Sequence, residues 1–226
     1  MQRKYPLLLI RHAQAEHHVK NLTGGWTDTN LTALGRRQAA ALSARLQQEL
    51  AGLLVRLISS DLKRAVQTAE IIAQGLGLDF SLEPGWRDYN NGIAASMEIS
   101  LADQLRAPYP PDRMAWRSHP SAESWGEFLE RICRTLEALP DFAGVTVIVT
   151  HSGTINGAFL WWLDLKPHYP ERPWVGCSVL PASITLLGQH EGESEIICVN
   201  DYAHLLPDQL IRPEWLTHKL GDLGAL

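Results

Sequence analysis

The sequence lacks the features that mark secreted, membrane-spanning and nucleic-acid-binding proteins. Its 226 residues include only 3 cysteines, Cys133, Cys177 and Cys198, without CxxC spacing, so we expect free thiols of a reducing compartment. No apolar run approaches the roughly 20 residues that cross a bilayer, and the first residues do not resemble a signal peptide. The net charge of -5 argues against the basic face of a nucleic-acid binder. We therefore expect a cytoplasmic protein without nucleic-acid or membrane partners.

Internal repeats, low-complexity runs and linkers are also missing. Hydrophobic residues at 45% and charged residues at 20% are typical of a globular protein with a sizeable core. We expect one domain over residues 1–226, with an insertion or cap over about 84–125. The pattern indicates no particular oligomeric state.

Apolar runs alternate with amphipathic segments along the chain. Buried strands are predicted at 7–10, 53–59, 80–82 and 145–149, and a hairpin at 184–187 and 196–199. Helices are predicted from Thr32 to about 50, from Asp61 as N-cap to about 75, from Ser121 or Ser124 to about 139, and after His151. Residues 12–31 and 84–97 are predicted loops. This order predicts an α/β fold with a doubly wound, mostly parallel sheet and helices on both faces.

Cationic side chains follow three of the predicted strands. Arg11 and His12 end the first, Arg64 lies in the first turn of the helix after the second, and His151 ends the 145–149 strand. The carboxyl ends of parallel strands converge, so these residues are expected to share one pocket. Two arginines and two histidines together suit a phosphate group, whose charge offsets their desolvation.

Phosphoryl transfer explains the rest of this pattern. One neutral imidazole can be a nucleophile that forms a phosphohistidine, while the other stays protonated and stabilises charge. A leaving alkoxide needs a proton, and Asp88 in the second loop is the candidate acid. Ser152, directly after His151, can contact the phosphate or cap the following helix.

Six motifs, taken in order, resemble the histidine phosphatase superfamily, also called phosphoglycerate mutase-like. They are residues 9–14 (LIRHAQ), 25–28 (GWTD), 31–39 (LTALGRRQA), 59–69 (SSDLKRAVQTA), 147–153 (VIVTHSG) and 200–205 (NDYAHL). The resemblance implies a phosphohistidine on His12 and Asp88 as proton donor. It also implies a phosphate site that includes Arg11, His18, Gly24, Arg64, His151 and Ser152.

Several positions depart from the family pattern. Ala13 stands in place of a glycine, His18 in place of an asparagine, and Asp88 in place of the more common glutamate. A Glu-Gly pair is replaced by Ala95 and Ser96.

The adjacent arginine pair of the glycolytic mutases is also missing from 100–120, where Arg113 and Arg117 are isolated. We therefore expect a phosphatase acting on a small phosphorylated metabolite, without a cofactor. A mutase and a non-catalytic phosphate-binding relative are the alternatives.

A metal-dependent hydrolase is a further alternative. His12, His17 and His18 with Asp28 form a histidine-rich group that could ligate zinc. The spacing matches no metal motif, and two arginines beside a metal cation would be costly, so no metal is expected. Other histidines, His119, His168, His190 and His218, are expected to be solvated.

The wall that selects the substrate is expected in 12–31 and 84–125. Aromatic residues there allow an organic group larger than glycerate (Trp86, Tyr89, Tyr109, Trp116 and Trp125).

Overall fold

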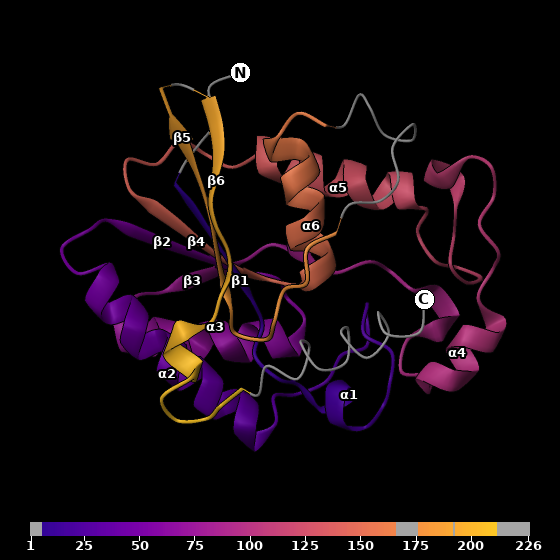
Figure 1. Cartoon of the computed structure of the whole chain (residues 1–226), viewed down its shortest axis with the longest axis horizontal. Helices are drawn as coiled ribbons and strands as arrows, with labels where there is room; N and C mark the ends of the chain where they lie inside the picture. Colours follow the sequence, from indigo (N-terminus) through magenta and orange to yellow (C-terminus); the bar gives the residue numbers. More distant parts are fainter. Residues whose placement is uncertain (1–5, 166–175, 192, 212–226) are drawn as a thin grey trace, which may run out of the picture.

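A six-stranded sheet forms the centre of the molecule (Figure 1). The computed structural model describes residues 6–165, 176–191 and 193–211. The strand order is β3-β2-β4-β1-β5-β6. Strands β1 to β4 are parallel to one another, and β5 pairs antiparallel with both β1 and β6. The strands are β1 (Leu7–Arg11), β2 (Val55–Ser59), β3 (Phe80–Leu82), β4 (Val145–Thr150), β5 (Ile184–His190) and β6 (Glu193–Asp201). The mostly parallel sheet and the predicted hairpin, which is β5 and β6, are confirmed.

Helices cover both faces of the sheet, as the alternation of apolar segments predicts. Figure 1 shows α2 (Ala33–Glu49) and α3 (Lys63–Leu76) on one side and α5 (Trp125–Glu137) and α6 (Ser152–Trp162) on the other. In β1, Leu8 and Ile10 belong to the core with α2 and α3, whereas Leu7 and Leu9 pack with α5 and α6. The period of two along a strand thus distributes one apolar run between two cores.

The carboxyl ends of β1, β2 and β4 meet at one edge of the sheet. Arg11 is in register with Thr150, and Ser59 is in register with Val149. Pairing continues one residue further, because the backbone N–H of His12 donates to the carbonyl of Thr150 at 2.9 Å. His12, Ser60 and His151 therefore start from neighbouring positions, as expected for a site at the end of parallel strands.

Helix caps agree with the sequence patterns at two positions and disagree at a third. The hydroxyl of Thr32 accepts from the N–H of Gly35 at the start of α2, and Ser124 caps α5. Asp61, predicted to cap α3, does not do so: the N-cap is Leu62. The carboxylate of Asp61 instead accepts two hydrogen bonds from Arg87, at 2.6 and 2.7 Å. A bidentate ion pair with a guanidinium is stronger than a capping bond and has drawn the carboxylate away from the helix.

The two long loops carry short helices. The 12–31 segment, predicted to be irregular throughout, contains α1 (Glu16–Val19). The predicted cap region contains η1 (Pro84–Trp86), η2 (Gly92–Ala94), α4 (Ile99–Leu105) and η3 (Arg113–Ala115), and η5 (Ala203–Leu205) follows the sheet. The three cysteines are free. Among the described residues, no helix combines the length and apolar character that a bilayer span requires.

Candidate active site

A cavity of about 310 Å³ opens at the carboxyl ends of β1 and β4. Six of the eight predicted site residues line it: Arg11, His12, His18, Gly24, Asp88 and Ser152. The other two, Arg64 and His151, are completely buried directly beside His12. His17, Leu22 and Ile99 complete the lining. The structure thus brings together residues that are up to 141 positions apart (Arg11 to Ser152).

The His12 ring is held in one tautomer. Its Nδ1 lies 2.7 Å from the carbonyl oxygen of Ala13, which can only accept, so Nδ1 carries the proton. Nε2 therefore has the free electron pair. Burial, together with the charges of Arg64, His151 and Arg11, lowers the pKa of His12 well below its usual value. The ring is neutral at physiological pH, the state that a nucleophile requires.

Arg64 is fixed against His12 by its whole guanidinium. Nε donates to His12 Nε2 at 3.1 Å, and the two terminal nitrogens donate to the carbonyls of Thr27 and Gly25. Burial lowers the pKa of Arg64 and of Arg11 to about 10, so both remain charged at neutral pH. The pocket is therefore cationic and suited to a phosphate.

His151 contributes a second buried imidazole. Its ring centre is 5.1 Å from that of His12, and its Nε2 lies 2.9 Å from the hydroxyl of Ser60. Its Nδ1 has no hydrogen-bond partner among the described residues. Burial lowers the pKa of His151 well below its usual value, with smaller effects of Arg64 and Arg11. These side chains alone favour neutral His151, so the protonated form expected from the sequence requires the negative charge of a phosphoryl group.

Arg11 and His18 each direct a hydrogen-bond donor, a guanidinium N–H and the ring Nε2–H, toward the same point. Nδ1 of His18 accepts from the backbone N–H of Ala15 at 3.1 Å, which assigns the ring proton to Nε2. That Nε2 lies 2.9 Å from a terminal nitrogen of Arg11, so two donors face each other. Burial lowers the pKa of His18 to about 2, which excludes a charge on the ring. A shared anionic oxygen would satisfy both donors.

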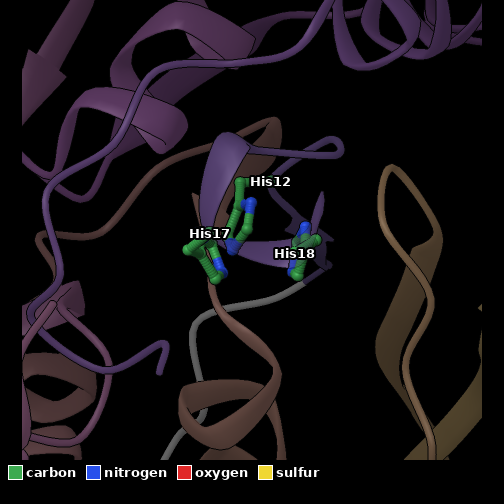
Figure 2. A group of neighbouring side chains, drawn as sticks. All are labelled: His12, His17 and His18. Carbon is green, nitrogen blue, oxygen red and sulfur yellow. The ribbon is translucent and has the colours of Figure 1, made fainter. Parts of the chain in front are cut away.

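His17, which the sequence indicated only as a possible metal ligand, also lines the cavity beside His12 and His18. Figure 2 shows His12, His17 and His18 side by side, and their nitrogens lie within 4.8 Å of one another. Asp28, the fourth candidate ligand, lies elsewhere: its carboxylate accepts from the backbone N–H of Lys63. Because guanidinium nitrogens of Arg11 and Arg64 lie 2.9 and 3.1 Å from the ring nitrogens of His18 and His12, a metal cation would have to displace two guanidinium groups. The geometry favours an anion over a metal.

Asp88 is half-buried and lines the same cavity as His12, His17 and His18. Burial raises the pKa of its carboxyl, against the opposing effect of Arg64, and thereby favours the protonated acid. The carboxyl packs against the start of α6, where a Cβ on Gly153 would lie 2.4 Å from Asp88 Oδ1. Only glycine leaves room for the acid at this position.

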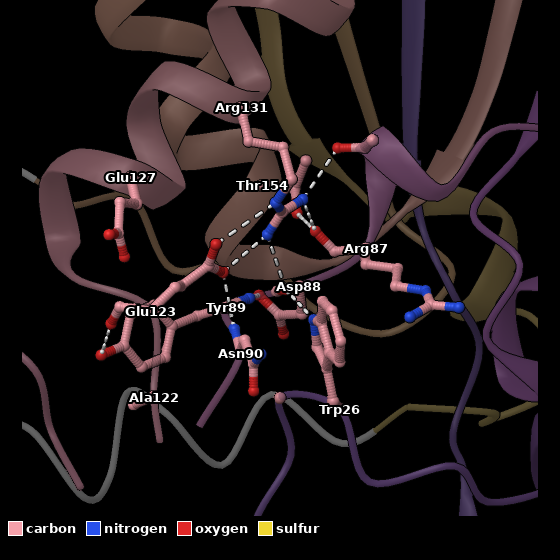
Figure 3. Close-up of polar contacts among 12 residues, drawn as sticks. Trp26, Arg87, Asp88, Tyr89, Asn90, Ala122, Glu123, Glu127, Arg131 and Thr154 are labelled. Carbon is pink, nitrogen blue, oxygen red and sulfur yellow. Dashed lines mark hydrogen bonds and ion pairs between the residues drawn. The ribbon is translucent and has the colours of Figure 1, made fainter. Parts of the chain in front are cut away.

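The backbone that carries Asp88 is anchored from three elements (Figure 3). Arg131 of α5 donates to the carbonyls of Gly85, Arg87 and Asp88, and Glu123 accepts from the same guanidinium at 2.7 Å. The indole N–H of Trp26 donates to the carbonyl of Asp88 at 2.8 Å, and the hydroxyl of Thr154 donates to that of Arg87 at 3.0 Å. Sequence reasoning missed these residues because their partners are backbone carbonyls, which leave no pattern of residue types.

Comparisons with known proteins identify the family to which the chain belongs. The chain is 33% identical over 177 residues, 73% of this chain and 77% of the relative, to a probable phosphoglycerate mutase GpmB of Proteus mirabilis. Its fold is similar to a mycobacterial glucosyl-3-phosphoglycerate phosphatase solved with VO3 (24% identity, 86% of this chain and 98% of that chain, TM-score 0.68). It is also similar to an α-ribazole phosphatase of Shigella flexneri (20% identity, 88% and 97% covered, TM-score 0.69). The model of the histidine phosphatase superfamily (branch 1) matches residues 7–202, and the chain belongs to this superfamily.

Proposed function

We propose that this protein is a phosphatase that hydrolyses small phosphomonoesters through a phosphohistidine on His12. The observation that carries the proposal is the tautomer of His12, whose unprotonated Nε2 lies in a pocket with two guanidinium groups and the carboxyl of Asp88. The names of the two solved phosphatases support hydrolysis, while the name of the Proteus relative supports a mutase.

The first step transfers the phosphoryl group to His12. Nε2 attacks phosphorus, the bond to the alcohol oxygen breaks, and protonated Asp88 gives its proton to that oxygen. Arg64, which donates to Nε2 in the structure, would donate to a phosphoryl oxygen instead. Arg11 and His18 supply two further donors.

The second step returns His12 to its neutral state. The Asp88 carboxylate takes a proton from water, the water oxygen attacks phosphorus, and the phosphorus–nitrogen bond breaks. His12 leaves with its electron pair on Nε2 and Nδ1 still protonated. Inorganic phosphate departs, and Asp88 is again an acid ready for the next ester.

Two isolated arginines of the cap region, Arg113 and Arg117, favour hydrolysis over mutase activity. Arg113 packs over the ring of Tyr109 at 4.1 Å, and Arg117 forms a bidentate pair with Glu127. Neither lines the cavity, so neither offers a free cation for a glycerate carboxylate. This supports the expectation, drawn from the missing arginine pair, of a phosphatase and not a mutase.

A non-catalytic role finds less support in the residues that depart from the family pattern. Ala13 is completely buried without disturbing the site, and its N–H donates to the hydroxyl of Thr68 at 3.1 Å. Ser96, where a Glu-Gly pair is replaced, has φ of 63° and donates its N–H to Thr27. His12 and Asp88 both line the cavity, which supports a catalytic role.

The decisive experiment traps the intermediate. Brief incubation with a 32P-labelled phosphomonoester and an alkaline quench should leave label on wild-type protein as phosphohistidine. His12→Ala should lose the label and reduce kcat by more than about 10³-fold. His190→Ala, at an exposed histidine at the end of β5, is the matched control and should keep both. Label that persists in His12→Ala would overturn the assignment of the nucleophile.

Metal removal separates this mechanism from a zinc hydrolase. Activity should survive dialysis against EDTA, and the purified protein should contain less than stoichiometric zinc by mass spectrometry. Loss of activity that added zinc restores would instead support the metal-dependent alternative.

A further inference from the structure

A second cavity of about 350 Å³ adjoins the phosphate pocket under the cap region. Gly24, Asp88 and Ile99 line both cavities, so the two meet at the proposed proton donor. An ester whose phosphorus faces His12 must place its leaving oxygen near Asp88. The rest of the alcohol then extends into the second cavity, which lies within the usual size range of small-molecule sites.

The charged groups of this second cavity neutralise each other. Arg106, at the C-terminal end of α4, donates to Asp103 of the same helix at 2.7 Å. Both side chains are about half exposed, at 46% and 55%. Asp88 is the other carboxyl in the lining. Arg106 carries the only guanidinium or ammonium group among the described lining residues, and Asp103 competes with a leaving-group carboxylate for it. An anionic leaving group would have to displace Asp103 from Arg106 to gain a cationic partner in this cavity.

The polar side chains of the cavity are also engaged within the protein. His119 was expected to be solvated, but it is buried: its Nε2 donates to the carbonyl of Ala102 at 2.8 Å, and Nδ1 lies 3.0 Å from the hydroxyl of Ser118. Trp116 donates its indole N–H to the carbonyl of Ala107, and the Tyr89 hydroxyl donates to that of Glu123. These bonds hold the walls in place and occupy the polar groups of these three side chains.

Apolar and aromatic side chains also form part of the wall of this cavity. Ala94, Ile99 and Ala102 line it together with Trp116, whose ring packs against Tyr109 with centroids 4.5 Å apart. Such a fixed aromatic wall favours a flat ring over a flexible chain.

We infer that the second cavity is the leaving-group site and that it selects phosphate esters of uncharged, ring-bearing alcohols over carboxylate-bearing ones such as phosphoglycerate. This inference rests on the proposed phosphatase function. Trp116 and Ile99 are its specificity-determining residues, because they line the cavity without taking part in phosphoryl transfer.

The test compares three alkyl esters whose leaving groups are similar in basicity. We expect kcat/KM to fall in the order 2-phenylethyl phosphate, glycerol 3-phosphate, 3-phosphoglycerate, with at least about tenfold between the first and the last. Uridine 5′-monophosphate, which carries an uncharged ring, should group with the first.

Two variants assign the preference to the cavity. Trp116→Ala should lower kcat/KM for 2-phenylethyl phosphate about tenfold and change that for glycerol 3-phosphate less than about threefold. Ile99→Ser should act in the same direction and keeps the test valid if Trp116→Ala does not fold, since Ile99 is 40% exposed. Leu101→Ser, on the same helix at 46% exposure but outside the cavity lining, is the matched control and should leave the ratio unchanged.

The outcomes separate this inference from the proposed function. Wild-type protein that hydrolyses 3-phosphoglycerate or glycerol 3-phosphate best would overturn the selectivity and leave the phosphatase mechanism standing. A ring preference that neither Trp116→Ala nor Ile99→Ser reduces would overturn the assignment to this cavity. Failure to hydrolyse any of the four esters, with no label on His12, would contradict the phosphatase itself.

Discussion

At the scale of single residues, the site depends on how each proton is held. The carbonyl of Ala13 keeps the proton of His12 on Nδ1, and burial raises the pKa of Asp88 and so favours its protonated carboxyl. One residue thereby offers an electron pair while the other offers a proton. Both states are needed at the same pH, and both result from local contacts.

The role of Asp88 is tested by leaving groups of different basicity. Asp88→Asn should reduce kcat about 10²- to 10⁴-fold for glycerol 3-phosphate, whose alkoxide must be protonated. The loss should be much smaller for 2,4-dinitrophenyl phosphate, which leaves without a proton. With the alkyl ester, wild-type kcat should decline at high pH as Asp88 loses its proton, and this alkaline limb should be absent from Asp88→Asn. Equal losses with both esters would contradict the assignment.

Gly153 is predicted to act only by leaving space for Asp88. Because an added Cβ would lie 2.4 Å from Asp88 Oδ1, Gly153→Ala should displace the carboxyl and lower kcat for glycerol 3-phosphate about tenfold or more. Adding Gly153→Ala to Asp88→Asn should cost little further activity in a double-mutant cycle. Additive losses would show that Gly153 matters for another reason.

At the scale of secondary structure elements, the acid is positioned by contacts among segments distant in the chain. The loop before Asp88 is fixed by α5 through Arg131, by α6 through Thr154 and by the 12–31 loop through Trp26. Arg87 of the same loop packs over the ring of Trp26 at 4.6 Å while it pairs with Asp61. The loop is therefore rigid where the proton must be delivered.

Arg131 is predicted to be a positioning residue for this loop. Arg131→Gln should lower kcat for glycerol 3-phosphate about tenfold, because Asp88 loses an anchor, and should affect 2,4-dinitrophenyl phosphate less. It should also shift the alkaline limb of the pH profile, which a purely structural role would not do. Arg134→Gln, three residues along α5 with a side chain that is 72% exposed, is the control and should resemble wild type. An unchanged pH profile in Arg131→Gln would refute the positioning role.

At the scale of the whole molecule, the pocket gathers four histidines with lowered pKa values. Burial is the largest cause for each of His12, His17, His18 and His151, with His17 lowered to about 3 and His18 to about 2. In the unfolded chain these four histidines bind protons near pH 6.5, whereas in the folded chain their lowered pKa values keep them neutral at this pH. Stability should therefore decrease as pH falls below about 6.5, by up to about 1.4 kcal/mol per pH unit for each proton taken up on unfolding.

This pH dependence is measured by urea unfolding between pH 7.5 and 5. The double variant His17→Asn/His18→Asn should lose less stability over this range than wild type, whereas the exposed His190→Asn should match wild type. Asp88 acts with the opposite sign, because its raised pKa favours the native state below that pKa, but it is one group against four. Parallel curves for wild type and the double variant would contradict the prediction.

Much of this protein was determined by its sequence alone. Period-two and helical apolar patterns are local, so β1, β4, α5 and the hairpin could be predicted from short windows. The mostly parallel sheet follows from the alternation of these segments. That sheet in turn forces Arg11, His12 and His151 to one edge, because parallel strands end on the same side.

Only the tertiary structure decided the details of the site, because they arise between segments that the sequence does not relate. Asp61 pairs with Arg87 and does not cap its helix, and His119 is buried and bonded to the carbonyl of Ala102. In both cases a partner distant in the sequence outweighs the local pattern. Arg131 acts on backbone carbonyls, which every residue has, so no motif could reveal it. The sequence determined which groups can carry out phosphoryl transfer, and the packing decided their protonation, their orientation and the shape of the space left for the substrate.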